Sequence, residues 1–280
     1  MNVLMLGLSD TGKTTFLAQL FGRMRASEGA LRLREAPADI TTIRDAYARL
    51  AEGLSVQHTT SDVTELPLAL PAVTPSGEHV EINMPDYAGE SLARLVREHH
   101  IDDMWRGMLT SSDLWLLFVR LEQFPEVPDL LDKPAGAIIE SRQKAAKDDS
   151  RTKGSASDLP LDMQLVELMQ VLLHERKARP RRRGNLPRLN VLLSCWDELG
   201  DTDRNVPPAL SSRRIPLLYQ FLTVTWPASM LQFLGVSAQG QDLSPNKPDQ
   251  NYAESTPAAN GYLVDPGGER TADLSAAILP

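Results

Sequence analysis

The stretch that decides the fold lies at residues 7–14 and reads Gly7-Leu8-Ser9-Asp10-Thr11-Gly12-Lys13-Thr14. It matches the pattern G-x-x-x-x-G-K-S/T at every specified position, which indicates a phosphate-binding loop. The two glycines let the backbone curl so that successive N–H groups point at phosphate oxygens. Lys13 is expected to reach the β and γ phosphates, and the Thr14 hydroxyl is expected to ligate Mg²⁺. The predicted nucleotide contacts in this region are Gly7, Asp10, Thr11, Gly12, Lys13, Thr14 and Thr15.

The sequence on both sides of the loop supports this interpretation. Residues 2–6 form a short apolar run that suits a buried parallel strand, and residues 15–21 open an amphipathic helix. The N-terminal dipole of that helix would face the phosphates. The alternative is a glycine-bounded turn between a strand and a helix that binds no ligand.

The composition describes an ordinary, slightly acidic protein. The chain has 280 residues, of which 42% are hydrophobic and 24% charged, and its net charge is −8. One elaborated domain is expected, because nucleotide-binding α/β folds often carry insertions. Nucleic-acid binding is not expected, because an acidic surface repels a phosphate backbone.

Cysteine content and hydropathy indicate the compartment. Cys195 is the only cysteine, so an intramolecular disulfide is impossible and a thiolate zinc site is implausible. The phosphate-loop motif begins seven residues into the chain, which leaves no room for a signal peptide. No apolar run approaches the roughly 18 residues of a membrane span. A cytoplasmic protein without a membrane span is therefore expected.

Hydrophobic patterning predicts strands that alternate with helices. Strands are expected at residues 2–6, 63–70, 79–84, 114–119, 188–194 and 230–236. Helices are expected from residue 15 and at residues 40–50, 91–109, 161–176 and, broken by a proline, 208–223. The strands at 63–70 and 79–84 should pair antiparallel, with Pro67 and Pro71 placing the first at a sheet edge. The predicted class is α/β, a mainly parallel sheet with helices on both faces.

Two regions interrupt this alternation. Residues from about 123 to 160 hold four prolines and a polar segment with little to bury, which indicates an insertion. Residues 240–257 are rich in Pro, Asn, Ser and Asp and indicate a loop. A short hairpin at residues 260–269 and a helix-like pattern at 271–279 complete the chain.

A candidate metal ligand follows the strand at residues 79–84. Asp86 lies at the end of that strand, where a carboxylate can hold Mg²⁺ opposite Thr14. Gly89 offers a bare backbone N–H that can approach the γ phosphate and rearrange when it leaves. The alternative is that Asp86 caps the helix that begins near Ser91.

Three strand-end motifs together resemble the ordered motif set of translation-factor-type and Ras-like GTPases, the TRAFAC class. They are Asp86-Tyr87-Ala88-Gly89-Glu90, Ser194-Cys195-Trp196-Asp197 and Ser237-Ala238-Gln239. The chain looks most like the bacterial double-GTPase group of predicted conflict, or immunity, systems. The resemblance implies a small-GTPase-like P-loop fold. It also implies a GTPase domain at residues 1–240 and a C-terminal extension at 241–280 packed on the same domain.

The resemblance assigns base recognition to two of these motifs. Asp197 matches the aspartate of the usual Asn-Lys-x-Asp motif, whose carboxylate accepts hydrogen bonds from the guanine N1–H and exocyclic amine. Ser237 and Ala238 match a later Ser-Ala motif, whose backbone N–H contacts the guanine O6. Ser194 and Cys195 depart from the usual Asn and Lys, which leaves the tightness of base binding open.

The resemblance also assigns catalytic positions. Glu90 occupies the position where many relatives carry a Gln that orients the attacking water, so slow hydrolysis is expected, with a partner's arginine as a possible aid. Thr60, or its neighbour Thr59, is the candidate switch threonine that senses the γ phosphate and Mg²⁺. Alternatively, Glu90 is a first-turn residue favoured by the helix dipole and Thr60 a solvated loop residue. The predicted catalytic residues are Lys13, Thr60, Gly89 and Glu90, and the predicted metal ligands are Thr14, Thr60 and Asp86.

The leading functional hypothesis is a Mg²⁺-dependent, GTP-binding switch that hydrolyses GTP slowly and is read by a protein partner, either a second GTPase or an effector. Two alternatives remain at this point: another P-loop ATPase or kinase, and a nucleotide-dependent assembly module with little turnover. The basic run from Arg176 to Arg183 is interpreted as helix-end cations in a solvated connector. Trp105 and Trp115 are expected in the core, and whether Trp196 lies near the base is left open.

Overall fold

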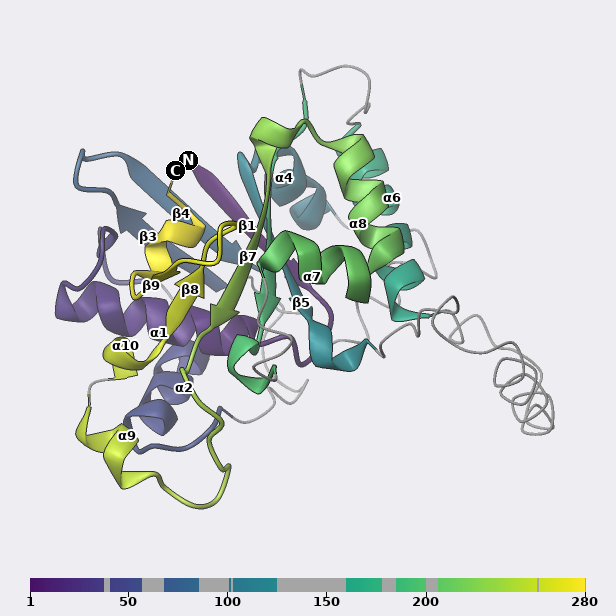
Figure 1. Cartoon of the computed structure of the whole chain (residues 1–280). Coiled ribbons are helices and arrows are strands. Elements are labelled where there is room, and N and C mark those ends of the chain that lie inside the picture. Colours follow the sequence, from purple (N-terminus) through teal and green to yellow (C-terminus); the bar gives the residue numbers. More distant parts are fainter. Residues whose placement is uncertain are drawn as a thin grey trace, which may run out of the picture.

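The fold is a single sheet covered on both faces by helices (Figure 1). The structure is a computed structural model that describes residues 1–37, 41–56, 68–85, 101, 103–124, 160–177, 185–199, 206–255 and 257–279. Within these ranges no helix combines the length and the apolar character needed to cross a membrane.

The described residues contribute nine strands to the sheet. They are β1 (Asn2–Gly7), β2 (Arg32–Leu33), β3 (Leu68–Val73), β4 (His79–Met84), β5 (Leu114–Arg120), β6 (Arg188–Ser194), β7 (Leu231–Ser237), β8 (Tyr262–Val264) and β9 (Arg270–Thr271). Their order across the sheet is β2-β3-β4-β1-β5-β6-β7-β8-β9. The five central strands run parallel, and two antiparallel strands extend each edge. The predicted α/β class with a mainly parallel sheet is confirmed, with antiparallel strands at both edges.

The central strands form because both of their faces are buried. Residues Leu114–Val119 of β5 are all at most 1% exposed, and successive side chains point to opposite faces. Trp115 and Leu117 join one apolar cluster, and Leu116 and Phe118 join the other. Strands of this kind are continuous apolar runs, which is why the sequence predicts them.

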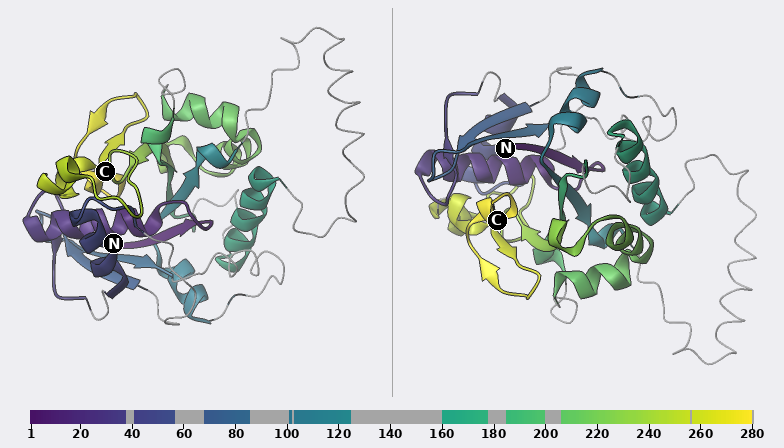
Figure 2. Two further views of the ribbon diagram at one scale, coloured as in Figure 1. Left: turned by 90° about the horizontal axis from the view of Figure 1, so that it is seen from below. Right: turned by 90° about the horizontal axis from the view of Figure 1, so that it is seen from above.

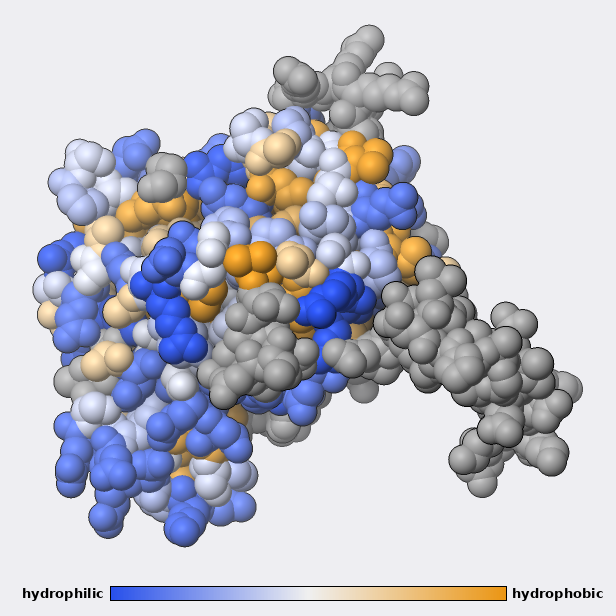
Figure 3. Space-filling model, in the orientation of Figure 1, coloured by the Kyte–Doolittle hydropathy of each residue, from blue (hydrophilic) through white to orange (hydrophobic). Residues whose placement is uncertain are grey.

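Two helical layers enclose the sheet (Figure 2). On one face lie α1 (Lys13–Ala26), α2 (Thr41–Ala51), α9 (Gln250–Glu254) and α10 (Pro257–Asn260), together with the 3₁₀ helix η5 (Leu274–Ala277). On the other face lie α4 (Asp103–Ser111), α6 (Leu161–Glu175), α7 (Pro207–Arg214) and α8 (Pro216–Thr225). Pro216 separates α7 from α8, as the sequence predicts. Leu217 and Val224 of α8 are 49% and 80% exposed, and Figure 3 shows apolar surface over this helix.

At the sheet edges and in the C-terminal region two predictions are wrong and one is confirmed. β3 is not an edge strand, because β2 pairs with its residues Ala72 and Val73. The predicted C-terminal hairpin forms as β8 and β9, and it joins the sheet beside β7. The short helices α9 and η5 lie where the sequence indicates a loop and a longer helical pattern. Such short elements contain too few residues to produce a periodic pattern.

Two predicted elements lie largely outside the described residues. Of the helix predicted at residues 91–109, the structure describes Ile101 and α4. Residues 125–159, which make up most of the predicted insertion at 123–160, also lie outside the described part of the chain.

Arg176 is a buried structural residue, so its interpretation as a solvated helix-end cation is wrong. Its side chain donates from Nε to the Asn185 carbonyl (2.8 Å) and from Nη1 to the Leu109 carbonyl and the Ser112 hydroxyl. The guanidinium also lies 5.8 Å from the centre of the Trp115 ring. Burial lowers the pKa of this guanidinium. These contacts fix the end of α6 to α4 and β5, and a run of arginines in the sequence does not reveal which member is buried.

Candidate functional site

The loop between β1 and α1 has the backbone of a phosphate-binding loop. Gly7 and Gly12 both have positive φ, at 149° and 76°. A Cβ on Gly7 would lie 2.8 Å from the Phe118 carbonyl oxygen, so no larger residue fits there. Asp10, with φ at 60°, supplies a further left-handed turn. The curl that the sequence predicts therefore depends on these two glycines.

Lys13 folds back over the loop that precedes it. Its ammonium donates to the carbonyl oxygens of Gly7 (2.9 Å) and Leu8 (2.6 Å) and to the Thr11 hydroxyl (3.3 Å). Burial lowers the pKa of Lys13 to about 8, an effect that the nearby Asp10 carboxylate opposes. The charge of Lys13 therefore becomes sensitive to pH above neutrality.

The N-terminus of α1 is open to an anion. Gly12 occupies the N-cap position, and no side chain in the described part of the chain caps this end of the helix. The first turn of α1 contains no acidic residue. Thr14 and Thr15 lie in that turn and are half-buried. Uncapped N–H groups and the positive end of the helix dipole form a ready site for a phosphate group.

The sheet brings the phosphate loop and the two predicted base motifs to one edge. Gly7 ends β1, Ser194 ends β6 and Ser237 ends β7, and all three strands run parallel. A Cβ on Gly12 would lie 3.9 Å from the Ser194 Cβ, so the phosphate loop rests against the end of β6. β1 lies between β4 and β5, and the strand order therefore reverses at β1. Parallel sheets bind ligands at this kind of switch point.

The residues after β6 combine a core contact with a carboxylate at the rim. Cys195 adopts a left-handed conformation (φ 54°) and leads into the 3₁₀ helix η3 (Trp196–Glu198). Trp196 is 2% exposed, and a Cβ on Gly235 would lie 2.6 Å from its ring. Trp196 therefore belongs to the core, as Trp105 and Trp115 do. Asp197, the next residue, is half-buried in η3.

The hydroxyls of Ser194 and Ser237 are used differently. Ser237 is fully buried, and its hydroxyl accepts a hydrogen bond from the Gly240 N–H (2.8 Å), which closes a turn behind Ala238. Ser194 is 5% exposed, and its hydroxyl has no hydrogen-bond partner among the described residues. Ser237 thus shapes the loop itself, whereas the Ser194 hydroxyl remains available below the phosphate loop.

An ion pair beside Asp197 is a feature that the sequence does not predict. Arg120, the last residue of β5, donates from Nη2 to both carboxylate oxygens of Glu198 (2.8 and 2.7 Å) and to Glu122 (2.9 Å). Burial raises the pKa of Glu198, and the bonds from Arg120 oppose that shift. The pair joins the ends of β5 and η3. One feature of the sequence could have indicated this ion pair: Arg120 and Glu198 both follow buried strands that are predicted to end at the same edge.

Five predicted site residues lie outside the described residues. They are Thr59, Thr60, Asp86, Gly89 and Glu90. β4 ends at Met84, so the predicted metal carboxylate closely follows a described strand in the sequence. The roles of these residues, and those of the described site residues, stay predictions.

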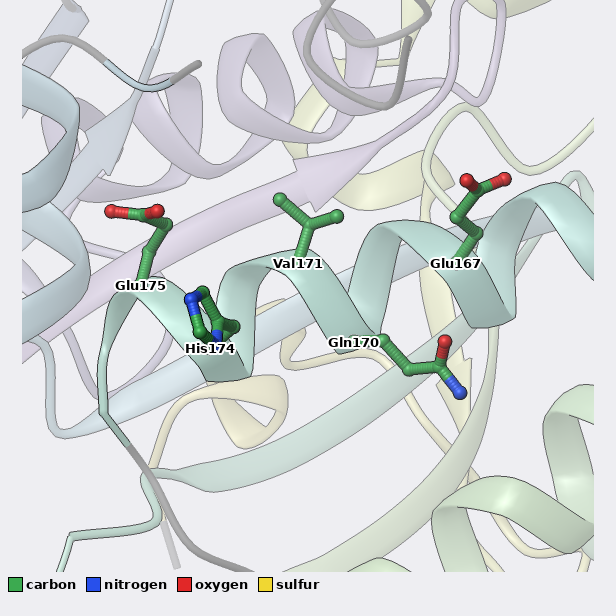
Figure 4. A pocket seen from close by; sticks show the side chains of 5 residues that line it. All are labelled: Glu167, Gln170, Val171, His174 and Glu175. Carbon is green, nitrogen blue, oxygen red and sulfur yellow. The ribbon is translucent and has the colours of Figure 1, made fainter. Parts of the chain in front are cut away.

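A separate hollow of about 510 Å³ runs along α6 (Figure 4). Glu167, Val171 and Glu175 project from one side of the helix, and Gln170 and His174 project from another. Glu175 also pairs with Arg106 of α4 (3.2 Å). None of these lining residues is a predicted nucleotide contact, so the hollow is not part of the candidate site.

The chain matches a family model described as Double-GTPase 1 over residues 4–279. Similar solved structures include the "probable GTP-binding protein engB" (13% identity, 86% of this chain and 91% of that chain, TM-score 0.37). The mammalian SRP receptor (13% identity, 86% and 94%, TM-score 0.35) is another. A third is the S. cerevisiae Ski7 GTPase-like domain bound to GTP (13% identity, 89% and 46%, TM-score 0.39). No curated protein matches the chain.

The thiol of Cys195 is expected to be unreactive in the folded protein. Burial raises its pKa to about 12, the Glu198 carboxylate adds to this shift, and Arg120 opposes it. At pH 8 the thiolate fraction is then on the order of 10⁻⁴, so a disulfide reagent should react on the order of a thousandfold more slowly than with a free cysteine. The reaction can be followed by absorbance, because Cys195 is the only cysteine. Urea should restore fast labelling, whereas fast labelling of the folded protein would contradict the raised pKa of the thiol.

Proposed function

Because the chain belongs to the Double-GTPase 1 family, we propose that it binds guanine nucleotide at the carboxyl edge of its sheet and hydrolyses GTP slowly. The observation that supports this most is the meeting of three strand ends. Gly7, Ser194 and Ser237 end parallel strands at one edge, which leaves Asp197 and Ala238 on the same rim as the phosphate loop. A GTP site requires a phosphate-binding loop and a carboxylate that hydrogen-bonds guanine at the same edge of the sheet.

In this proposal the phosphate loop works by exchanging internal contacts for phosphate contacts. The longest bond of the Lys13 ammonium, to the Thr11 hydroxyl (3.3 Å), gives way to a β or γ phosphate oxygen. The uncapped N–H groups of the first turn of α1 bind further oxygens. Asp10 lies on the exposed part of the loop, beside the phosphate chain.

In the same proposal Asp197 selects the base. Its carboxylate accepts two hydrogen bonds from guanine, whereas adenine offers no matching pair of donors. The backbone N–H of Ala238 donates to the guanine O6. Ser194 and Cys195 stand where Asn and Lys are usual; Ser194 and Trp196 are buried, and Cys195 between them adopts a left-handed conformation.

The residues fit Mg²⁺ as far as they are described. Thr14 presents a hydroxyl oxygen in the first turn of α1, and a hard cation prefers such oxygen ligands. The described residues contain no cluster of three or more His, Cys, Asp or Glu side chains that could hold a metal without the nucleotide. Thr14, Asp86 and Thr60 would hold the ion together with the phosphates. When bound, Mg²⁺ neutralises charge on the β and γ phosphates.

Hydrolysis and its use as a signal complete the proposal. Glu90 orients the attacking water less well than a Gln does, because its negative charge approaches a developing negative charge, so turnover is slow. Thr60 and Gly89 respond to the γ phosphate and to its loss, and a protein partner, either a second GTPase or an effector, distinguishes the GTP form from the GDP form. The setting is a bacterial conflict or defence system in the cytoplasm. Residues 1–240 form the GTPase domain, with residues 241–280 as its extension.

The replacement Asp197→Asn tests base selection. The native protein is expected to bind GDP at least about tenfold more tightly than ADP, because a site that hydrogen-bonds its ligand rejects an analogue without those groups. The variant is expected to prefer xanthosine diphosphate, whose C2 oxygen needs a donor. Affinities are measured by calorimetry in Mg²⁺ buffer. Asp45→Asn is the matched control, since Asp45 is exposed on α2, and it should change nothing.

Equal affinity of the native protein for GDP and ADP would refute guanine selection and favour an ATPase or kinase. A guanine preference without phosphate release from GTP, with or without a candidate partner, would favour an assembly module.

The contribution of Lys13 is expected to depend on pH. The pKa of Lys13 is about 8, so its ammonium is charged and attracts phosphate at lower pH and loses its proton at higher pH. The contribution of Lys13 to nucleotide affinity therefore falls as the pH rises. Between pH 7.5 and 9 the ratio of GDP affinities, native protein over Lys13→Met, should fall by about tenfold. Titration of GDP itself affects both proteins equally and therefore does not change this ratio. A ratio that stays constant over this interval would show that the Lys13 pKa is not lowered.

A further inference from the structure

The C-terminal part of the chain packs against the loop that carries the second base motif. We name residues 237–240 the base loop and residues 260–272, which include β8 and β9, the C-terminal clamp. We propose that the C-terminal clamp holds the base loop in the position that recognises guanine, with Gly261, Gly240 and Arg23 as positioning residues. This proposal rests on the guanine site proposed above.

The two segments approach each other so closely that neither glycine can carry a side chain. A Cβ on Gly240 would lie 1.9 Å from the Asn260 carbonyl oxygen, and one on Gly261 would lie 2.4 Å from the Ala238 carbonyl oxygen. Separations under 3 Å require the backbone to move. The pairing of Ser237 with Tyr262 and of Val236 with Leu263 extends this contact along β7 and β8.

The contact falls on the peptide group that would face the base. A Cβ on Gly261 would also lie 3.1 Å from the Ser237 carbonyl oxygen. That carbonyl and the Ala238 N–H belong to one trans peptide group, so the N–H points the opposite way, away from the clamp. A shift of Gly261 therefore turns or displaces the donor that is proposed to reach the guanine O6.

The clamp is tied in turn to the helix that begins at the phosphate loop. Arg23 of α1 is 4% exposed and donates to the carbonyl oxygens of Gly261 (2.8 Å) and Ala272. Gln19, one turn earlier, donates to the hydroxyl of Tyr252 (2.8 Å) in α9, which precedes the clamp. In Figure 1 β8 and β9 lie beside α1, in agreement with these bonds. Through Arg23, the clamp sets the base loop at a fixed position relative to α1.

A hydrogen bond to a ligand needs its donor placed to within about half an ångström, which is why remote packing can decide base selectivity. A clamp with a purely structural role would instead change stability alone. The two roles are separated by comparing GDP, which uses the base loop and the phosphate loop, with ADP, which uses the phosphate loop only.

The experiment measures GDP and ADP affinities of the native protein, Gly261→Ala and Gly107→Ala, together with the melting temperature of each. Gly107 lies in α4, and among the described residues a Cβ added to it would meet no heavy atom within 4 Å beyond its chain neighbours and its own helix backbone, so its replacement is the matched control. Gly261→Ala is expected to lower GDP affinity at least about tenfold and to leave ADP affinity within about twofold. Gly107→Ala is expected to keep both affinities.

A second pair of variants keeps the test decisive if Gly261→Ala does not fold. Arg23→Met removes both donated bonds and should lower the GDP-to-ADP affinity ratio, and Arg23→Lys should restore part of it. A lower melting temperature with an unchanged ratio in Gly261→Ala or Arg23→Met would overturn the positioning role and leave the guanine site intact. A native protein without preference for GDP would overturn both proposals.

Discussion

The rest of the structure depends on β1 having a parallel strand on each side. α1 follows β1 and covers one face of the sheet, whereas α4 lies between β4 and β5 in the sequence and covers the other face. In parallel sheets, ligands bind at the carboxyl edge beside a strand with this placement. The uncapped N-terminus of α1, the end of β6 and the end of β7 lie at that edge. The positions of the described candidate residues therefore follow from the strand order.

The phosphate loop and the proposed base side of the site are built by different means. The phosphate loop is local, since eight consecutive residues supply its two glycines, its lysine and its helix start. The proposed base side is assembled from distant segments: η3 after β6, the turn after β7, and the C-terminal hairpin that packs against that turn. A local loop can be read from a motif. An assembly of distant segments depends on packing, so its residues are harder to recognise in the sequence than those of a local motif.

This difference explains how much could be predicted from the sequence. The central strands and most helices were predictable because buried parallel strands are continuous apolar runs and because Pro216 marks a break. The strand ends of Gly7, Ser194 and Ser237 were predictable from motifs. The burial of Arg176, the pair of Arg120 and Glu198 and the core position of Trp196 were not, because each depends on a partner far away in the sequence. Nor could Gly240 and Gly261 be told from ordinary loop glycines. For Thr60, Asp86, Gly89 and Glu90 the motif remains the basis of their predicted roles.

The most direct measurement of the central claim is hydrogen exchange of the backbone amides with Mg²⁺ and either GDP or ADP. If one rim grips both phosphate and guanine, GDP should slow exchange in residues 8–15 and in residues 237–240 together, while saturating ADP slows exchange in residues 8–15 only. Protection of residues 8–15 alone by GDP, or identical protection by the two nucleotides, would contradict a guanine site at this edge of the sheet.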